Sequence, residues 1–193
     1  PSRYNLSTRV YDSNNNKATE VSQIERARTD GASGLIVCPL DVEILADTLR
    51  SVQQAGMPLV MMATEVETFG GVLIAGDDYL MGLEAGRAAG QIIRDEMGGH
   101  ADVIILDYPD LKYLVTRADG LEAGVLEIAP EAHIIGRFPG GTSDNGRQSV
   151  SNLIADSVRF DVILSINDAG SYGAIAAMEA AEIDPDSVVI SSV

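Results

Sequence analysis

The stretch from Phe160 to Glu182 sets a short apolar run, a polar tip and a helical pattern directly after one another. Val162 to Ile166 is apolar and has the length of a buried strand. Asn167 and Asp168 end this run, and from Ala169 onward small and apolar residues recur at helical spacing. We expect Asp168 to cap the helix, because its carboxylate can accept the free amide hydrogens of the first turn. The stretch therefore predicts a strand, a polar loop and a helix.

The same unit repeats along most of the chain, with glycine or proline between the copies. Strands are expected at residues 4–11, 34–38, 59–62, 72–75, 102–106, 133–138, 162–166 and 187–193. Helices are expected at residues 17–30, 42–55, 79–97, 111–129, 147–156 and from 169 onward. Strict alternation of apolar strands with helices is typical of parallel sheets that helices cover on both faces. The sequence therefore predicts an α/β protein.

Only between residues 59 and 75 do two predicted strands follow each other without a helix. A chain that crosses from one α/β lobe to another would produce such a break. We therefore predict two Rossmann-like lobes, with residues 1–76 in the first and 77–193 in the second. In open parallel sheets, ligands bind beyond the carboxyl ends of the strands, so we expect polar residues at those ends to face the ligand.

The long predicted helix at residues 79–97 carries Gly82, Gly86 and Gly90 at a spacing of four. This spacing places the three glycines on one face of the helix. Each glycine lowers helix stability by about 1 kcal/mol relative to alanine, so a compensating contact is expected. The glycines predict that another backbone packs closely on this face.

The charge balance argues against nucleic acid as a direct partner. The chain has 29 acidic and 13 basic residues and a net charge of −16, and its basic residues form no cluster. Binding to a phosphate backbone needs a basic face, so we expect no direct nucleic-acid contact through this chain. No apolar stretch approaches the ~20 residues of a membrane helix. The start at Pro1, without a charged leader, is typical of a processed or truncated product.

Sequence signatures of catalysis or metal binding are weak. His100 and His133 are the only histidines, and His133 begins a predicted strand, away from the expected ligand side. Neither G-x-S-x-G nor a Walker loop occurs, and the glycine-rich residues 139–146 are interpreted as a turn. The single cysteine, Cys38, follows an apolar run and is expected to be a small buried residue. We therefore expect no catalytic residue, no metal and no cofactor.

Several segments, taken in order, carry a family resemblance. They are DSNNN at 12–16, GASGLIVCPLD at 31–41, LADTLRSVQQAGMPLV at 45–60, IAGDDYLMGLEAG at 74–86, TRADG at 116–120 and LSINDAGSYGAIAAM at 164–178. Their order and spacing resemble the type I, sugar-type periplasmic binding proteins and the effector-binding domains of lactose-repressor-type regulators, which share that fold. The resemblance covers nearly all of the chain. It implies two lobes that close on a small ligand, usually a sugar, by a hinge motion.

The resemblance also implies that binding residues lie at the strand ends that face the cleft. Asn167 matches a polar family position in the second lobe, and its amide suits a hydroxyl-rich ligand, although a capping role is the alternative. Thr64 and Glu65 follow a first-lobe strand, and we predict that Thr64 and Asn167 project into the cleft from opposite walls. Arg117 matches an arginine of an R-x-x-G motif that is as often structural as ligand-binding.

Other residues at predicted strand ends are weaker candidates for ligand contact. Asp12, Asn14 and Asp41 follow first-lobe strands. Tyr108, Tyr113 and Phe138 are the aromatic residues nearest to the second-lobe strand ends, where a sugar ring could stack on an aromatic face. Packing at the rim explains each of these aromatic residues equally well.

The chain departs from the family pattern in two ways. Ala63 and Thr64 stand where ribose-type binders carry an acidic–basic pair, and Val115 stands where they carry another ligand arginine, so we expect a less cationic cleft. Family members also have a strand and a helix before the DSNNN element and continue beyond Val193. That additional first strand would lie inside the sheet, and a gap there would leave ladder groups unpaired. We hypothesise that the molecule contains more chain or that another segment fills this position.

The function predicted from these observations is ligand binding in a bacterial ABC-type transport system. Such a protein would bind a sugar or another small polar solute in the cell envelope, periplasmic or extracellular, and deliver it to a membrane permease. The first alternative is the effector-binding core of a lactose-repressor-type transcription regulator, which would be cytoplasmic and homodimeric. The second alternative, of another class, is an α/β enzyme acting on a phosphorylated or nucleotide substrate.

Overall fold

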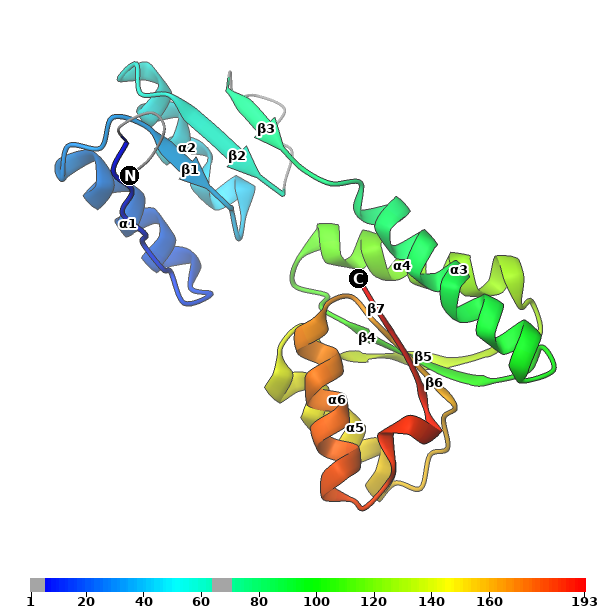
Figure 1. Ribbon diagram of the computed structural model, residues 1–193. Coiled ribbons are helices and arrows are strands. Elements are labelled where there is room, and N and C mark those ends of the chain that lie inside the picture. Colours follow the sequence, from blue (N-terminus) through cyan, green and yellow to red (C-terminus); the bar gives the residue numbers. More distant parts are fainter. Residues whose placement is uncertain (1–5, 64–70) are drawn as a thin grey trace. The chain divides into compact units, whose positions relative to one another are not determined.

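The chain consists of two compact α/β units, Pro1–Ala75 and Gly76–Val193 (Figure 1). The computed structural model describes residues 6–63 and 71–193. Every strand pair in both sheets is parallel. The predicted α/β class with parallel sheets is therefore confirmed.

The first unit is built on a three-stranded sheet with the order β1-β2-β3. Its elements are α1 (Lys17–Thr29), β1 (Leu35–Val37), α2 (Val42–Gln54), β2 (Leu59–Met62) and β3 (Val72–Ile74). Asn16 caps α1 by accepting a hydrogen bond from the Thr19 amide at 2.9 Å. Both helices pack on one face of the sheet, where their buried aliphatic side chains meet those of Val37, Leu59 and Met61.

The other face of this sheet is apolar but exposed. Strand register places five side chains on it, and we call this set the bare face: Ile36, Val60, Met62, Val72 and Ile74. Ile36 is 69% exposed, Val72 58% and Ile74 57%. No described helix of this unit packs there. The prediction of helices on both faces is therefore wrong for the described part of this sheet.

The segment before α1 differs from its prediction. A strand was expected at residues 4–11, but the described part, Leu6 to Tyr11, does not form one. It is held against α1 instead, because Arg9 and Tyr11 both donate to the Asp30 carboxylate, at 2.6 and 2.8 Å. A run of alternating residues becomes a strand only when a partner strand supplies ladder hydrogen bonds. The described sheet has β1 at its edge, and residues 6–11 are not paired with it.

The second unit is built on a four-stranded sheet with the order β5-β4-β6-β7. Its strands are β4 (Asp102–Asp107), β5 (His133–Pro139), β6 (Val162–Ser165) and β7 (Val189–Ser192). Its helices are α3 (Asp78–Glu96), α4 (Lys112–Ile128), α5 (Ser143–Ala155), α6 (Asp168–Ala180) and the short 3-10 helix η1 (Pro185–Ser187). Helices α3 and α4 cover one face, and α5 and α6 cover the other (Figure 1). Residues 103–106 of β4 are consequently fully buried.

Glycines bring α3 and α4 into backbone contact. A Cβ atom on Gly86 would fall 3.0 Å from the Leu121 carbonyl carbon and 3.1 Å from the Gly124 Cα. Gly82 meets the Arg117 backbone in the same way, and Gly90 lies against Ile128. The close backbone approach predicted from the glycine spacing is therefore confirmed.

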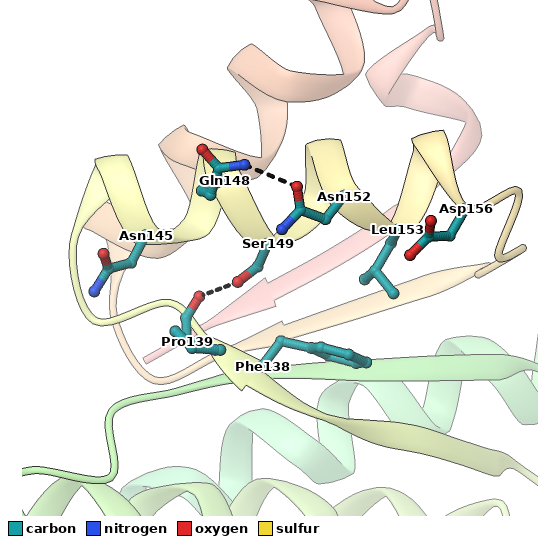
Figure 2. A pocket seen from close by; sticks show the side chains of 8 residues that line it. All are labelled: Phe138, Pro139, Asn145, Gln148, Ser149, Asn152, Leu153 and Asp156. Atoms are coloured by element: carbon teal, nitrogen blue, oxygen red, sulfur yellow. Dashed lines mark hydrogen bonds between the residues drawn. The ribbon is translucent and has the colours of Figure 1, made fainter.

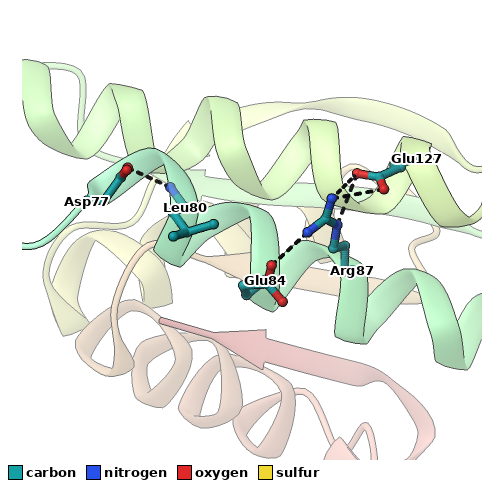
Figure 3. Close-up of polar contacts among 5 residues, drawn as sticks. All are labelled: Asp77, Leu80, Glu84, Arg87 and Glu127. Carbon is teal, nitrogen blue, oxygen red and sulfur yellow. Dashed lines mark hydrogen bonds and ion pairs between the residues drawn. The ribbon is translucent and has the colours of Figure 1, made fainter.

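Polar contacts fix the same pair of helices at their surface (Figure 3). Asp77 caps α3 by accepting a hydrogen bond from the Leu80 amide at 2.9 Å. Arg87 on α3 makes a bidentate ion pair with Glu127 on α4, at 2.8 to 3.0 Å, and also binds Glu84 at 2.7 Å. The two helices are thus joined by backbone packing along their contact and by an ion pair at its edge.

Helices α5 and α6 begin earlier than predicted, because the residues that cap them come earlier in the chain than the predicted starts. Helix α5 begins at Ser143, one turn before the predicted start, since the Thr142 hydroxyl accepts a hydrogen bond from the Asn145 amide at 3.2 Å. Part of the glycine-rich segment predicted to be a turn is therefore helical. Helix α6 is capped by Asn167, and Asp168 is its first residue, so the prediction that Asp168 is the cap is wrong.

Candidate functional site

The carboxyl ends of the second unit's strands bring several polar groups together around Asn167. Its side-chain oxygen accepts a hydrogen bond from the Gly170 amide at 2.9 Å, and its side-chain nitrogen donates to the Gly141 carbonyl at 3.0 Å. The carboxamide therefore joins the loops that follow β5 and β6. An amide has two donor hydrogens and two acceptor lone pairs, so one of each is left over by these two bonds. Asn167 is thus a structural residue that keeps hydrogen-bonding capacity.

Asp107 and Tyr108 follow β4 at the same end of the sheet. The Asp107 carboxylate is 6% exposed, accepts a hydrogen bond from the Tyr108 amide at 2.6 Å, and lies 3.8 Å from Arg137. Burial raises the pKa of Asp107, and the Tyr108 amide and Arg137 oppose this effect. The half-buried Tyr108 ring packs against the Gly141 backbone, where a Cβ atom would fall 2.5 Å from the ring.

Sequence reasoning missed Asp107 and Arg137. The available signal was a carboxylate as the last residue of a strand whose other residues are apolar. Arg137 also pairs with two carboxylates of α4, Asp119 and Glu122, each at 2.8 Å. These contacts could not be predicted, because α4 and β5 come together only in the folded unit.

Arg117 is engaged in structural contacts. Its guanidinium binds one carboxylate oxygen of Asp78, at 2.5 and 3.0 Å, and donates to the Ile166 carbonyl at 2.8 Å. The two charged side chains are 16% and 11% exposed. Arg117 thereby joins the start of α3, the middle of α4 and the end of β6. Its contact with a ligand remains a prediction.

The candidates in the first unit also hold their own loops. Asp41 caps α2 by accepting from the Glu43 and Ile44 amides at 3.0 and 3.1 Å, and its second oxygen lies 2.9 Å from the Lys17 ammonium. The Lys17 contact, with these amides, lowers the pKa of Asp41. Asp12 is exposed and accepts from the Asn14 amide at 2.8 Å.

Two further predictions fall in this unit. Cys38 is exposed, so its expected burial is wrong. Partial desolvation and the nearby Glu20 carboxylate raise the pKa of the Cys38 thiol. Thr64 and Glu65 lie outside the residues that the structure describes, so their prediction stays open.

Glu20 of α1 is a buried carboxylate that sequence reasoning did not single out. It is 7% exposed and accepts a hydrogen bond from the Leu40 amide at 3.1 Å, which ties α1 to the loop after β1. Burial raises its pKa, and the Leu40 amide opposes this. Its helical position gave no signal, since the first turn of a helix commonly carries an exposed acid.

A groove of about 460 Å³ lies between β5 and α5 (Figure 2). Phe138 and Pro139 line it from the strand, and the helix contributes Asn145, Gln148, Ser149, Asn152, Leu153 and Asp156. The Ser149 hydroxyl donates to the Pro139 carbonyl at 2.6 Å, and Gln148 donates to Asn152 at 2.8 Å. Phe138 is the one predicted aromatic candidate in this lining.

Within residues 6–63 and 71–193, no group of three or more His, Cys, Asp or Glu side chains is arranged to hold a metal ion. In the same part of the chain, no helix is both long enough and apolar enough to span a membrane.

Comparison with known proteins places this geometry in a family. A family model described as "Periplasmic binding protein domain" matches residues 2–192. The chain belongs to the periplasmic binding protein family. The resemblance stated from its motifs is therefore confirmed. The family and its structural neighbours are binding proteins.

Individual members of the family are only distantly similar. The xylitol-binding protein of Mycolicibacterium smegmatis is 25% identical over 87% of this chain and 48% of its own length. The ribose import binding protein of Escherichia coli is 26% identical over 92% of this chain and 58% of its own length. The Caulobacter myo-inositol binding protein, solved with myo-inositol, has a TM-score of 0.78 at 22% identity and is similar in fold over 96% of this chain and 63% of its own. This chain thus spans about half the length of the curated relatives.

Proposed function

We propose that this chain is part of a solute-binding protein that delivers a sugar or polyol to a bacterial ABC-type transporter. The observation that carries the proposal is the family match over residues 2–192. The relatives named for xylitol and ribose support a hydroxyl-rich ligand. The proposed location is the cell envelope, and the proposed partner is a membrane permease.

The proposed role is binding without a chemical step. Asn167 is the proposed principal contact, because its amide keeps one donor and one acceptor beside its structural bonds. Tyr108 is the proposed stacking face. Arg117 is proposed to hold the strand end in place, with its own ligand contact secondary. Asp12, Asp41, Thr64 and Glu65 remain proposals for the first unit.

A binding experiment on the purified protein tests this function. We expect isothermal titration calorimetry to give saturable binding to at least one of xylitol, ribose and myo-inositol, with the ligand recovered unchanged. Binding only to phosphorylated sugars, or conversion of any of them, would favour the enzyme alternative. Sequence-specific binding of DNA by the intact natural polypeptide would favour the regulator alternative.

A variant that keeps the cap separates the ligand role of Asn167 from its capping role. Serine is also a good N-cap, so Asn167→Ser keeps a capping oxygen but removes the amide nitrogen, together with its bond to the Gly141 carbonyl. We expect the ligand affinity to fall about tenfold or more, since a polar group of the ligand loses its partner. Thr142→Ala is the matched control. It removes the cap of α5, another helix of the same unit, and should leave the ligand affinity unchanged. Equal affinities in all three proteins would exclude Asn167 as a contact.

A further inference from the structure

The groove between β5 and α5 extends away from the groups around Asn167 (Figure 2). It reaches from Pro139, the last residue of β5, to Asp156, the C-cap of α5. Helix α5 returns the chain to the start of β6, so the Asp156 end lies toward the amino ends of the strands. Among the described hydrogen bonds, none joins a residue of the groove to Asn167. The groove's volume of about 460 Å³ lies within the range of small-molecule sites, about 300 to 1,000 Å³.

The wall that α5 contributes is rich in carboxamides. Its polar residues recur along one side of the helix at spacings of three or four: Asn145, Gln148, Ser149, Asn152 and Asp156. A carboxamide both donates and accepts hydrogen bonds, which matches the hydroxyl groups of a sugar. Gln148 donates to the Asn152 side-chain oxygen at 2.8 Å, which fixes the Asn152 amide and leaves its two hydrogens for a ligand. This wall therefore suits a neutral ligand with many hydroxyl groups.

The strand contributes an aromatic surface to the same groove. Phe138 is half-buried, packs against the aliphatic side chains under α5 and α6, and lines the groove with the rest of its ring (Figure 2). A sugar ring has an apolar C–H side and a polar rim, so an aromatic ring beside hydrogen-bonding groups suits both parts of it. Asp156 adds a strong acceptor at the far end. A carboxylate at the C-terminal end of a helix is electrostatically unfavourable, so helix stability does not explain this residue.

We propose that this groove is a second carbohydrate site, which binds a neutral mono- or disaccharide. An anionic ligand fits less well, because no lysine or arginine is among the described residues of the lining and Asp156 would repel it. An extended peptide would have to pair with β5, the edge strand of the described sheet. Pro139 has no amide hydrogen, and the register of β5 with β4 skips Ile135, a bulge of the kind that hinders strand addition. The inference goes beyond the proposed function, because it concerns a different site.

NMR spectroscopy of the isotope-labelled natural polypeptide tests the site. Maltose, cellobiose and methyl α-glucoside are titrated, and the side-chain amide signals of Asn145, Gln148, Asn152 and Asn167 are followed. We expect at least one of these sugars to shift the three groove signals with a dissociation constant of about 1 mM, because a site open to water keeps little net binding energy. The Asn167 signal should not follow the same curve. This readout separates the groove from the proposed ligand contact, so either proposal can fail without the other.

A substitution in the wall tests whether the amides bind the sugar. Asn152→Leu removes the fixed amide at an exposed helical position and keeps the size of the side chain. We expect the dissociation constant to rise about fivefold or more, since a sugar hydroxyl loses its partner. Gln91→Leu is the matched control, because it exchanges an amide for leucine at an exposed position of α3 and should leave the dissociation constant unchanged.

Every other outcome overturns the proposal. Groove signals that stay in place with all three sugars, or that move in proportion to sugar concentration without saturating, would mean that no site exists. Shifts confined to Asn167 would place the sugar at the other contact. Shifts that follow protein concentration without added sugar would assign the groove to a second copy of the chain. Equal affinities of the Asn152→Leu and Gln91→Leu proteins would exclude the amide wall as the binding surface.

Discussion

The two sheets of this chain have similar strands but different surroundings. Strands β4 and β6 are buried on both faces, between α3 and α4 on one side and α5 and α6 on the other. Strands β1 to β3 are just as apolar, but the described helices bury only one of their faces. Each fully buried aliphatic side chain contributes about 1.5 to 3 kcal/mol to stability, so the second unit gains much more from its strands. An apolar strand thus indicates that cover is needed, but not whether it is present.

The largest expected effect concerns the glycine contact between α3 and α4, which has no counterpart between the described helices of the first unit. In Gly86→Val, the new side chain meets the Leu121 and Gly124 backbones, which cannot move aside. We expect the second unit to lose about 3 kcal/mol or more, as in severe overpacking. Hydrogen exchange of second-unit peptides measures this loss. Ala88→Val, on the exposed side of α3, is the control, and equal exchange in both variants would contradict the contact.

One substitution made in both sheets sharpens the comparison directly. Ile104→Ala empties a fully buried position in β4 and should cost about 2 to 5 kcal/mol. Ile36→Ala, at a position 69% exposed in β1, should change the stability of residues 1–193 by about 0.5 kcal/mol or less. Urea unfolding followed by hydrogen exchange in each unit measures both values. Similar losses at the two positions would mean that the bare face is already covered within this chain.

Removing an ion pair should likewise cost more stability in the second unit than in the first. Arg117→Met leaves the Asp78 carboxylate and the Ile166 carbonyl without their partner. The side chains of Arg117 and Asp78 are only 16% and 11% exposed, so we expect the second unit to lose about 2 kcal/mol of stability. Lys17→Met removes a pair with Asp41 whose side chains are 47% and 25% exposed, and should cost less than about 1 kcal/mol. Protection of α3 and α2 amides against exchange reports the two losses. A larger effect from Lys17 would reverse the expected order.

The smallest effect is a pH dependence that both units should share. Glu20 and Asp107 each have a pKa raised by burial, from ordinary values of 4.5 and 3.8. Because the folded protein holds these protons more tightly, each carboxyl group adds stability below its ordinary pKa, and this is lost as the pH rises through the raised value. Glu20→Gln and Asp107→Asn should therefore be more stable, relative to the natural residue, at pH 7 than at pH 4. Hydrogen exchange at both pH values, corrected for intrinsic rates, checks this, and a difference of opposite sign would contradict the burial argument.

Local patterns predicted most helices and strands to within a residue or two. The close packing on the face with Gly82, Gly86 and Gly90 was predictable, because the spacing of the three glycines is itself a local pattern. The early start of α5 at Ser143 was missed because a threonine cap competes with the turn tendency of the glycines before it. The predicted burial of Cys38 was wrong, since burial depends on which other elements pack against a residue.

The candidate site was less predictable than the fold. Asn167 was identified from its place after a strand, but its bond to Gly141 joins residues that are 26 positions apart. Asp78, the partner of Arg117, is 39 positions away, so the structural role of Arg117 could only be named as an alternative. The burial of the carboxylates Glu20 and Asp107 could not be predicted, because it arises from packing between separate elements.

The Arg117 contacts have a mechanical consequence. Asp78 is the first residue of α3, and the chain reaches it directly from the end of the first unit at Ala75. Arg117 fastens that residue to the Ile166 carbonyl, which immediately precedes Asn167. A pull on residues 75–77 therefore cannot be absorbed by fraying at the start of α3. It acts instead on the end of β6, because Arg117 links Asp78 to the Ile166 carbonyl, and Asn167 is the next residue.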